Sequence, residues 1–306
     1  MNGAPKQALK VATGSSPIVP PIPGADKDHV LTSREILEID ALPQDLVIVG
    51  GGVIGMEFAC FFSSVGVNVT VIEMLPEILP PYDPDLAKEL RRQLKAVDYK
   101  LGCQVKEITD DTVVFEEDGE RHAVDADTVL MSVGRSPNTA GLGLDAVGVD
   151  YDRAGIKVND KLETNIPGIY AVGDVNTRSM LAHSASRMGE VVVNNLTGRP
   201  DRMRYHAIPY VVYTDPDVAA VGPTAAQAEA EGRNVESAEL RMAANGRHLA
   251  EHDRPAGFTK VVVDADTRAL LGVHMIGSHA SELITTAVSM VEAELRVEDI
   301  RDIVFP

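Results

Sequence analysis

Three glycines in this sequence have the spacing of a nucleotide-binding turn, Gly50-x-Gly52-x-x-Gly55. They follow an apolar run at 46–49 and precede a predicted helix at 53–65. The first glycine permits a tight turn, the second lets backbone approach a pyrophosphate, and the third lets the helix pack closely on the strand. The N-terminus of such a helix offers N–H groups to an anion. The pattern predicts dinucleotide binding; the alternative is a strand–helix–strand crossover whose glycines serve packing alone.

One acidic residue indicates which dinucleotide would bind. Glu73 ends the next apolar run, 69–73, roughly 20 residues after the glycines, where a carboxylate accepts hydrogen bonds from an adenosine ribose. A 2′-phosphate would be repelled by this charge, and residues 74–79 contain no Arg, Lys or His to receive it. The sequence therefore favours NAD(H) over NADP(H).

Composition sets the broad class of the protein. The chain has 306 residues, of which 44% are hydrophobic, enough for two or more domains with their own cores. No apolar run reaches the roughly 18 residues of a membrane span, and residues 1–6 do not resemble a signal peptide. The net charge of −18 argues against binding to nucleic acid.

The two cysteines, Cys60 and Cys103, are too far apart in the sequence to form a CxxC pair. Cys60 lies in the apolar stretch of the predicted helix, so we expect it to be a free, buried thiol. Neither cysteine indicates a metal site or a redox pair. This cysteine usage favours a reducing cytoplasm.

Periodicity gives a coarse order of elements. Residues 1–35 are rich in proline and glycine and are expected to be loosely structured, with a short helix at 33–37. A further helix opens after 82–84 and carries Leu86, Leu90, Leu94 and Val97. Other helices are predicted at 181–196, 224–231 and 281–295. Strands are predicted at 46–49, 67–73, around Val105, in a hairpin of 112–115 with 121–124, and at 127–133, 166–172, 209–213, 218–221, 258–263 and 269–276.

The ordered motifs of the chain resemble those of the pyridine nucleotide-disulfide oxidoreductases, and within that family the dihydrolipoamide dehydrogenases. Each motif alone is modest evidence, whereas the ordered set is specific and covers nearly the whole chain. The motifs lie at 12–15, 50–57, 73, 133–138, 170–175, 180–183 and 208–222.

The resemblance implies an α/β fold with three parts. Residues 36–155 would form a Rossmann-like NAD-binding domain, a βαβ unit with a β-meander. Residues 1–35 and 156–205 would be a remnant of an FAD-binding domain. Residues 206–306 would form an α+β interface domain, built on an antiparallel sheet, through which the chain forms a homodimer.

The resemblance also implies cofactor-binding residues and no catalytic residue in this chain. The glycines would carry the NAD pyrophosphate, Glu73 the adenosine ribose and Val105 the adenine, while Glu57 and Gly134 would lie near the nicotinamide. Asp174 would bind the ribityl or ribose hydroxyls of FAD. The implied NAD set is Gly50, Gly52, Val53, Ile54, Gly55, Glu57, Glu73, Val105 and Gly134, and the FAD set is Thr13, Gly14, Ser15, Asp174, Met180, Leu181, Ala182 and His183.

Simpler interpretations of several residues remain open. Asp174 fits a turn or a helix cap, and His183 fits a helix N-terminus without a cofactor contact. We favour a structural role for Arg135, as a tie within a loop. The stripe at 281–295 suits either a core or a partner surface. His248 and His252 lie four residues apart, but the glycines and proline around them argue against a metal-binding helix, and no metal is expected.

Two parts of the family pattern are not found in this sequence: a flavin-binding glycine turn with its Cys-x4-Cys pair, and a His-Pro-Thr-x-x-Glu segment. We therefore expect the chain alone to be catalytically incomplete for the reaction dihydrolipoamide + NAD → lipoamide + NADH. It would bind NADH weakly or moderately and FAD poorly. Without the missing flavin unit, Ile169, Ala171 and Val172 would lose cover.

Other functions remain open at this stage. The chain also fits another disulfide reductase of the family, of the mercuric or glutathione type, although Glu73 argues against a member specific for NADP. A non-catalytic NAD-binding and dimerisation module is the other class. The resemblance implies a 2-oxo acid dehydrogenase or glycine cleavage complex as the partner of the complete enzyme, and neither nucleic acid nor membrane as a partner.

Overall fold

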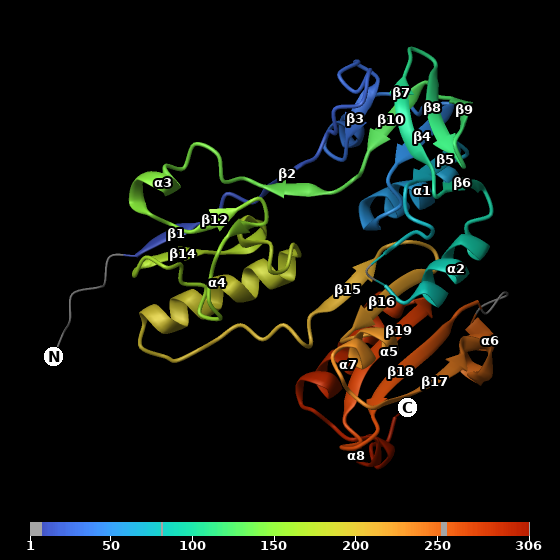
Figure 1. The fold of residues 1–306 in the computed structure, drawn as a ribbon. Coiled ribbons are helices and arrows are strands. Elements are labelled where there is room, and N and C mark those ends of the chain that lie inside the picture. The colour runs from blue at the N-terminus through green and yellow to red at the C-terminus, as the bar shows by residue number, and fades with distance from the viewer. Residues whose placement is uncertain (1–7, 81, 252–255, 306) are drawn as a thin grey trace. The chain divides into compact units, whose positions relative to one another are not determined.

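The computed structural model describes residues 8–80, 82–251 and 256–305. The chain forms two compact units, one of residues 1–18 with 134–205 and one of residues 19–133 with 206–306 (Figure 1). The chain therefore crosses between the units three times. Each unit has its own core and is described separately.

The larger unit contains a parallel five-stranded sheet in the order β3-β10-β4-β5-β6. Its residues alternate between two cores, because successive side chains of a strand point to opposite faces. Leu46 and Ile48 pack with two helices, whereas Val47 and Val49 pack against a three-stranded meander. The strands are Val30–Thr32 (β3), Thr128–Met131 (β10), Asp45–Val49 (β4), Asn68–Glu73 (β5) and Val97–Leu101 (β6).

The two faces of this sheet are covered as the βαβ-plus-meander expectation requires. Helices α1, Val53–Ser64, and α2, Pro84–Gln93, cover one face. The antiparallel meander covers the other, and a left-handed Asp118-Gly119 turn connects its last two strands. The meander strands are Gln104–Ile108 (β7), Thr112–Glu117 (β8) and Glu120–Asp125 (β9).

One predicted helix is too long. The sequence spacing extends the second helix to Val97, but α2 ends at Gln93 with Leu94 as its cap. Val97 instead begins β6 and pairs with Val69 of β5. Leu94 and Val97 are both buried, so the apolar spacing continues through the turn although the helix does not.

The C-terminal part of the larger unit is an antiparallel sheet in the order β15-β16-β19-β18-β17. One face joins the core that contains α1 and α2, and the other packs on α7, Ala280–Glu292. The sequence does not predict the edge strand β17, because its residues are almost fully exposed and form no apolar face. The strands are Pro209–Val212 (β15), Asp217–Val221 (β16), Leu270–Gly277 (β19), Phe258–Asp264 (β18) and Val235–Arg241 (β17).

Short helices complete this part of the unit. Helix α5, Ala225–Ala230, begins with a capping box between Thr224 and Gln227, as its predicted start requires. The remaining helices are Met242–Ala244 (η3), Gly246–Glu251 (α6) and Val297–Arg301 (α8). No helix in the described ranges is long and apolar enough to cross a membrane.

The smaller unit is built from short strands and one long helix. Its buried core contains Ala171 and Val175, and Val172 is also buried, with Ile169 half-buried. The expectation that Ala171 and Val172 lose their cover is therefore wrong, because other segments of this unit pack over them. The elements are Leu9–Val11 (β1), Ser15–Pro17 (β2), Arg135–Pro137 (β11), Leu144–Val147 (α3), Tyr151–Asp152 (β12), Gly155–Ile156 (β13), Ile169–Ala171 (β14), Gly173–Asn176 (η2) and Ala182–Leu196 (α4).

The unit boundaries differ from the domain boundaries expected from the sequence. The expected limits at 35/36 and 155/156 correspond to observed limits at 18/19 and 133/134. Within 1–35, which was expected to be loosely structured, β3 pairs in parallel with β10 and so belongs to the larger unit. The short helix expected at 33–37 is a 3-10 turn, Glu35–Glu38 (η1). Strand pairing over long sequence separations decides these limits, and local composition does not reveal it.

An ion cluster joins the two parts of the larger unit. Lys260 Nζ on β18 donates to both carboxylate oxygens of Asp83, each at 2.9 Å, and to Asp85 Oδ2 at 2.7 Å. Asp83 is also the N-cap of α2. Burial opposes the charge on Lys260, but hydrogen bonds to Asp85 and Asp83 outweigh it and raise the pKa of the lysine. The cluster fixes the start of α2 against the C-terminal sheet.

We expect Lys260→Gln to lower the free energy of unfolding by about 2–3 kcal/mol at pH 7, because it leaves the buried Asp83 without its cation. The hydrogen bond from Lys260 lowers the pKa of Asp85 below 3.8, so this carboxylate stabilises the fold above pH 3.8 and loses that effect as pH falls through its folded pKa. Urea unfolding from pH 7 to pH 3 should therefore show that the difference in unfolding free energy between Lys260→Gln and the unsubstituted chain shrinks below pH 3.8.

Lys88→Gln is the matched control, because Lys88 faces the same Asp85 at 3.8 Å but is exposed. Its effect should stay below about 0.5 kcal/mol, as for other exposed pairs. Equal losses in the two variants would contradict the structural role of Lys260.

Candidate functional site

The glycine turn lies where β4 ends and α1 begins. Gly50 has a φ of +106°, and a Cβ there would lie 2.6 Å from Ser132 O. A Cβ on Gly55 would lie 2.1 Å from Gly50 O, so the helix can approach the turn only with glycine at this position. The first and third glycines thus have the packing roles that the motif predicts.

The middle glycine and the start of α1 face open space. A Cβ on Gly52 would meet nothing within 4 Å. The first helical hydrogen bond runs from Met56 N to Gly52 O at 2.9 Å. The N–H groups before Met56 in the first turn therefore have no acceptor within the helix. No described side chain caps this N-terminus, and its first turn has no acidic residue. Open backbone and an uncapped helix start fit the pyrophosphate of a dinucleotide.

Glu73 lies beside this turn at the end of β5, with only 8% of its surface exposed. Gly51 N donates to its Oε2 at 2.6 Å, and Leu75 N donates to its Oε1 at 2.8 Å. No ion pair with Glu73 is found in the described part of the chain. The structure therefore holds a buried carboxylate with backbone amides alone, which fits an acceptor for hydroxyl groups.

Glu57 lies on α1, one turn after the glycine turn, and is half-buried. Its Oε1 accepts from Tyr213 N at 3.0 Å. Burial raises the pKa of Glu57, and the Tyr213 N–H partly offsets this effect. Burial together with the nearby Glu57 charge also raises the pKa of Tyr82, whose ring packs edge-on against Tyr210 with centroids 6.4 Å apart.

Ser132 is a site residue that the sequence reasoning missed. Its Oγ donates to Gly50 O at 2.9 Å and lies 3.0 Å from Val49 O, so it holds the turn from the neighbouring strand. A signal existed: Ser132 directly follows β10, and parallel strands end at the same edge of a sheet. Only the strand order, with β10 next to β4, places it at the turn.

Val105 lies on β7, as predicted, and is 8% exposed within the core beneath the meander. Cys103 N donates to Glu73 O at 3.0 Å, so β7 starts beside the end of β5. Gly134 belongs to the smaller unit, where its carbonyl accepts from Ile18 N at 3.0 Å. Every predicted NAD residue except Gly134 thus lies in the larger unit.

The predicted FAD residues gather in the smaller unit. Ser15 Oγ donates to Asp174 Oδ2 at 2.6 Å and accepts from Arg135 Nε at 2.7 Å. Arg135 Nη2 also donates to Ser15 O at 2.7 Å. Arg135 therefore ties β11 to β2, which is the structural role favoured from the sequence. Asp174 lies in the turn η2, and its Oδ1 takes no part in these hydrogen bonds with Ser15 and Arg135.

The remaining predicted FAD residues lie directly before Ser15 and at the start of α4. Thr13 Oγ1 donates to Asn138 O at 2.7 Å, and Asn138 N donates to Gly14 O at 2.9 Å. Helix α4 begins at Ala182 after the N-cap Leu181, whose side chain makes no capping bond. An uncapped helix start next to a turn aspartate fits part of a flavin nucleotide. Met180, Leu181, Ala182 and His183 form this helix start.

Both cysteines are free. The expectation for Cys60 is only partly correct, because it is half-buried, and its Sγ accepts from Asp215 N at 3.3 Å. Cys103 is the buried thiol and donates to Leu101 O at 3.4 Å. Burial raises the pKa of both thiols, which disfavours the reactive thiolate.

The described residues hold no cluster of His, Cys, Asp and Glu that could bind a metal. His252, the second member of the doubtful histidine pair, lies outside the described residues.

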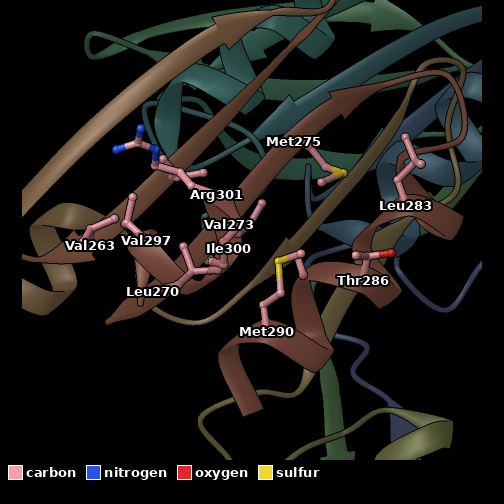
Figure 2. Close-up of a pocket in the computed structure, with 12 residues that line it drawn as sticks. Val263, Leu270, Val273, Met275, Leu283, Thr286, Met290, Val297, Ile300 and Arg301 are labelled. Atoms are coloured by element: carbon pink, nitrogen blue, oxygen red, sulfur yellow. The ribbon is translucent and has the colours of Figure 1, made fainter. Parts of the chain in front are cut away.

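A separate groove of about 400 Å³ lies in the C-terminal domain, between its sheet and the helices α7 and α8 (Figure 2). Its lining is apolar except for Thr286 and Arg301. Leu283 on α7 is 53% exposed, which is unusual for a leucine beside other apolar side chains. The lining also includes Val261, Val263, Leu270, Val273, Met275, Ala287, Met290, Val297 and Ile300.

Comparison with known proteins places these features in a family. Residues 6–189 match the family described as pyridine nucleotide-disulphide oxidoreductase. Residues 208–306 match the dimerisation domain of the same family. The two matches follow the order of the nucleotide-binding elements and the antiparallel sheet.

Curated relatives agree with this assignment. The dihydrolipoyl dehydrogenase of Cupriavidus necator is 39% identical over 309 residues, which cover 98% of this chain and 65% of that protein. Dihydrolipoyl dehydrogenase 1, mitochondrial, of Arabidopsis thaliana is 37% identical over 301 residues, covering 95% of this chain and 59% of that protein. This chain thus spans less than two thirds of the length of these relatives.

Solved structures share the fold over nearly all of the chain. The flavoprotein disulfide reductase RclA of Escherichia coli matches with a TM-score of 0.88 and 30% identity, over 98% of this chain and 71% of that one. LpdA of Mycobacterium tuberculosis matches with a TM-score of 0.88 and 28% identity, over 98% and 66%. The family predicted from the ordered motifs is thereby confirmed: this chain belongs to the pyridine nucleotide-disulphide oxidoreductases.

Proposed function

We propose that this chain is the NAD-binding and dimer-forming part of a dihydrolipoyl dehydrogenase, which passes electrons from dihydrolipoamide to NAD through FAD. The observation that carries the proposal is the pairing of an open, uncapped α1 N-terminus with Glu73, a buried carboxylate that forms no ion pair among the described residues. The curated relatives with this name supply the substrate class.

The residues of the nucleotide site would divide the dinucleotide among them. The first turn of α1 would bind the pyrophosphate through backbone N–H groups, with Gly52 leaving room for its approach. Glu73 would accept from the adenosine ribose hydroxyls, and Val105 would contact the adenine. Glu57, next to the aromatic pair of Tyr82 and Tyr210, would lie at the nicotinamide end.

The smaller unit would supply the flavin contacts. Asp174, held by Ser15, would accept from ribityl or ribose hydroxyls, and the start of α4 would face the flavin. When bound, the two cofactors supply the hydride and electron transfer, whereas this chain orients them. By its resemblance to the dihydrolipoamide dehydrogenases, the complete enzyme would serve a 2-oxo acid dehydrogenase or glycine cleavage complex. The two free thiols suit a reducing compartment such as the cytoplasm.

A second candidate function is a non-catalytic module that binds NAD and dimerises. The observation in its favour is that Cys60 and Cys103 are both free and have raised pKa values. The two therefore do not form the reactive cysteine pair that thiol–disulfide exchange with lipoamide requires. Glu73 argues against a reductase of the family that is specific for NADP.

Gly52→Ala should separate binding from folding. We expect it to raise the dissociation constant for NADH at least roughly tenfold, because the methyl group would enter the space left for the pyrophosphate. Its melting temperature should stay close to that of the unsubstituted chain, since the new Cβ meets no protein atom within 4 Å. NADH fluorescence titration and thermal unfolding measure the two effects.

Gly55→Ala provides the contrast, because its Cβ would lie 2.1 Å from Gly50 O and should lower stability as well as binding. If the unsubstituted chain shows no saturable NADH binding, the proposed site is wrong.

Lipoamide turnover should be undetectable for these 306 residues with NADH and added FAD, because the sequence has no cysteine pair. A spectrophotometric assay of NADH oxidation with lipoamide tests this, with an intact dihydrolipoyl dehydrogenase as the positive control. Binding without turnover fits the proposal. Turnover above the background without protein would contradict the expectation that this chain alone is catalytically incomplete.

We also propose that the C-terminal domain pairs with a second copy through the exposed side of α7, in line with its match to a dimerisation domain. Leu283→Asp should then shift the chain from dimer to monomer in light scattering, because a charge would enter an apolar contact. Leu42→Asp is the matched control, since Leu42 is 56% exposed against 53% for Leu283 and is not part of this domain. A Leu283 variant that remains dimeric would exclude this surface.

A further inference from the structure

Gly51, the first variable position of the glycine motif, has both backbone polar groups bonded inside the protein. Its N–H donates to Glu73 Oε2 at 2.6 Å, and its carbonyl accepts from Leu79 N at 2.9 Å. The motif itself places no demand on this position. Here the residue connects the glycine turn, the acid at the end of β5 and the loop that follows β5.

The surroundings of Gly51 are tight for a side chain. A Cβ there would lie 2.9 Å from Ile78 Cγ2 and 3.4 Å from both Cβ and Oε2 of Glu73. Ile78 and Leu79 are each only 1% exposed. Leu79 also has a φ of +50°, so this loop is held in an unusual conformation against the turn. A side chain here would require Ile78 to shift, and its Cβ would lie in van der Waals contact with the Glu73 carboxylate.

The two backbone bonds fix the Glu73 carboxylate while leaving it able to bind hydroxyls. Each carboxylate oxygen can accept about two hydrogen bonds, and Gly51 and Leu75 each use one. Both oxygens retain capacity for a donor such as a ribose hydroxyl. A carboxylate anchored on both oxygens also cannot swing away from a 2′-phosphate, so repulsion of NADPH is built into its position.

We infer that Gly51 is a positioning residue that sets the preference for NADH over NADPH by fixing Glu73. The inference rests on the proposed NAD site and adds to it a residue that the motif does not require. Because both backbone polar groups of Gly51 are bonded inside the protein, it would act on the nucleotide through Glu73, and its substitution should weaken ribose recognition more than pyrophosphate binding.

The test uses Gly51→Ala in the full chain, with NADH and NADPH as separate probes in fluorescence titrations. We expect the dissociation constant for NADH to rise roughly tenfold, the usual size of one displaced charge-assisted hydrogen bond. The constant for NADPH should change less than about twofold, so the NADH/NADPH ratio of dissociation constants rises at least about fivefold. Equal increases for both nucleotides would indicate a general distortion of the turn and would overturn the inference.

A second substitution isolates the cause. Ile78→Leu removes the γ2 methyl that the new Cβ would meet while conserving side-chain volume. Gly51→Ala with Ile78→Leu should recover most of the NADH affinity and of the NADH/NADPH ratio, whereas Ile78→Leu alone should change neither. This double variant also replaces the single one if the latter does not fold, as judged by circular dichroism. A folded double variant without recovery contradicts the inference.

Gly246→Ala is the control glycine, because its Cβ would meet nothing within 4 Å and it lies on α6. It should leave both dissociation constants unchanged. Failure of the unsubstituted chain to bind NADH would overturn the proposed function together with this inference. Binding with an unchanged nucleotide ratio in Gly51→Ala would overturn the inference alone.

Discussion

The close approach of α1 to the end of β4 is the constraint on which the proposed nucleotide site depends. It exists because Gly55 has no Cβ: with one, the helix would meet the carbonyl of Gly50 at 2.1 Å. Ser132 holds the same turn from the neighbouring strand by donating to Gly50 O at 2.9 Å. Together these contacts aim the first turn of the helix away from the protein, so its N–H groups remain available to an anion.

The same corner combines two opposite electrostatic elements. The N-terminus of α1 carries a partial positive charge, whereas Glu73 carries a negative charge with little exposed surface. Among the residues that the structure describes, backbone amides and no lysine or arginine stabilise Glu73. A cation would compete with hydroxyl groups for the carboxylate, whereas amides satisfy part of it and leave the rest available. This arrangement suits a ligand with a phosphate at one position and neutral hydroxyls at the next.

The larger unit positions this corner with contacts made over long sequence separations. Lys260 of the C-terminal sheet bonds to Asp83 at the start of α2, and Tyr213 N bonds to Glu57 on α1. Helices α1 and α2 are thus both fastened to the domain that matches the dimerisation family. Because α1 carries Glu57 and the start of the anion site, changes in the C-terminal sheet have a physical route to the nucleotide site through these bonds.

The sequence by itself determined the turn, the acid and the family. Glycine spacing and a strand-ending glutamate are local features, and their chemistry follows from backbone geometry, which is why the βαβ unit with its meander was predicted correctly. Local features could not show that Val97 begins β6, that β17 forms an exposed edge, or that β3 joins the parallel sheet, because strand pairing joins residues that are distant in the chain. Only the tertiary structure revealed the roles of Ser132 and Gly51. Hydrogen bonds to other strands and loops define these roles, and local sequence does not show which strands and loops lie next to them.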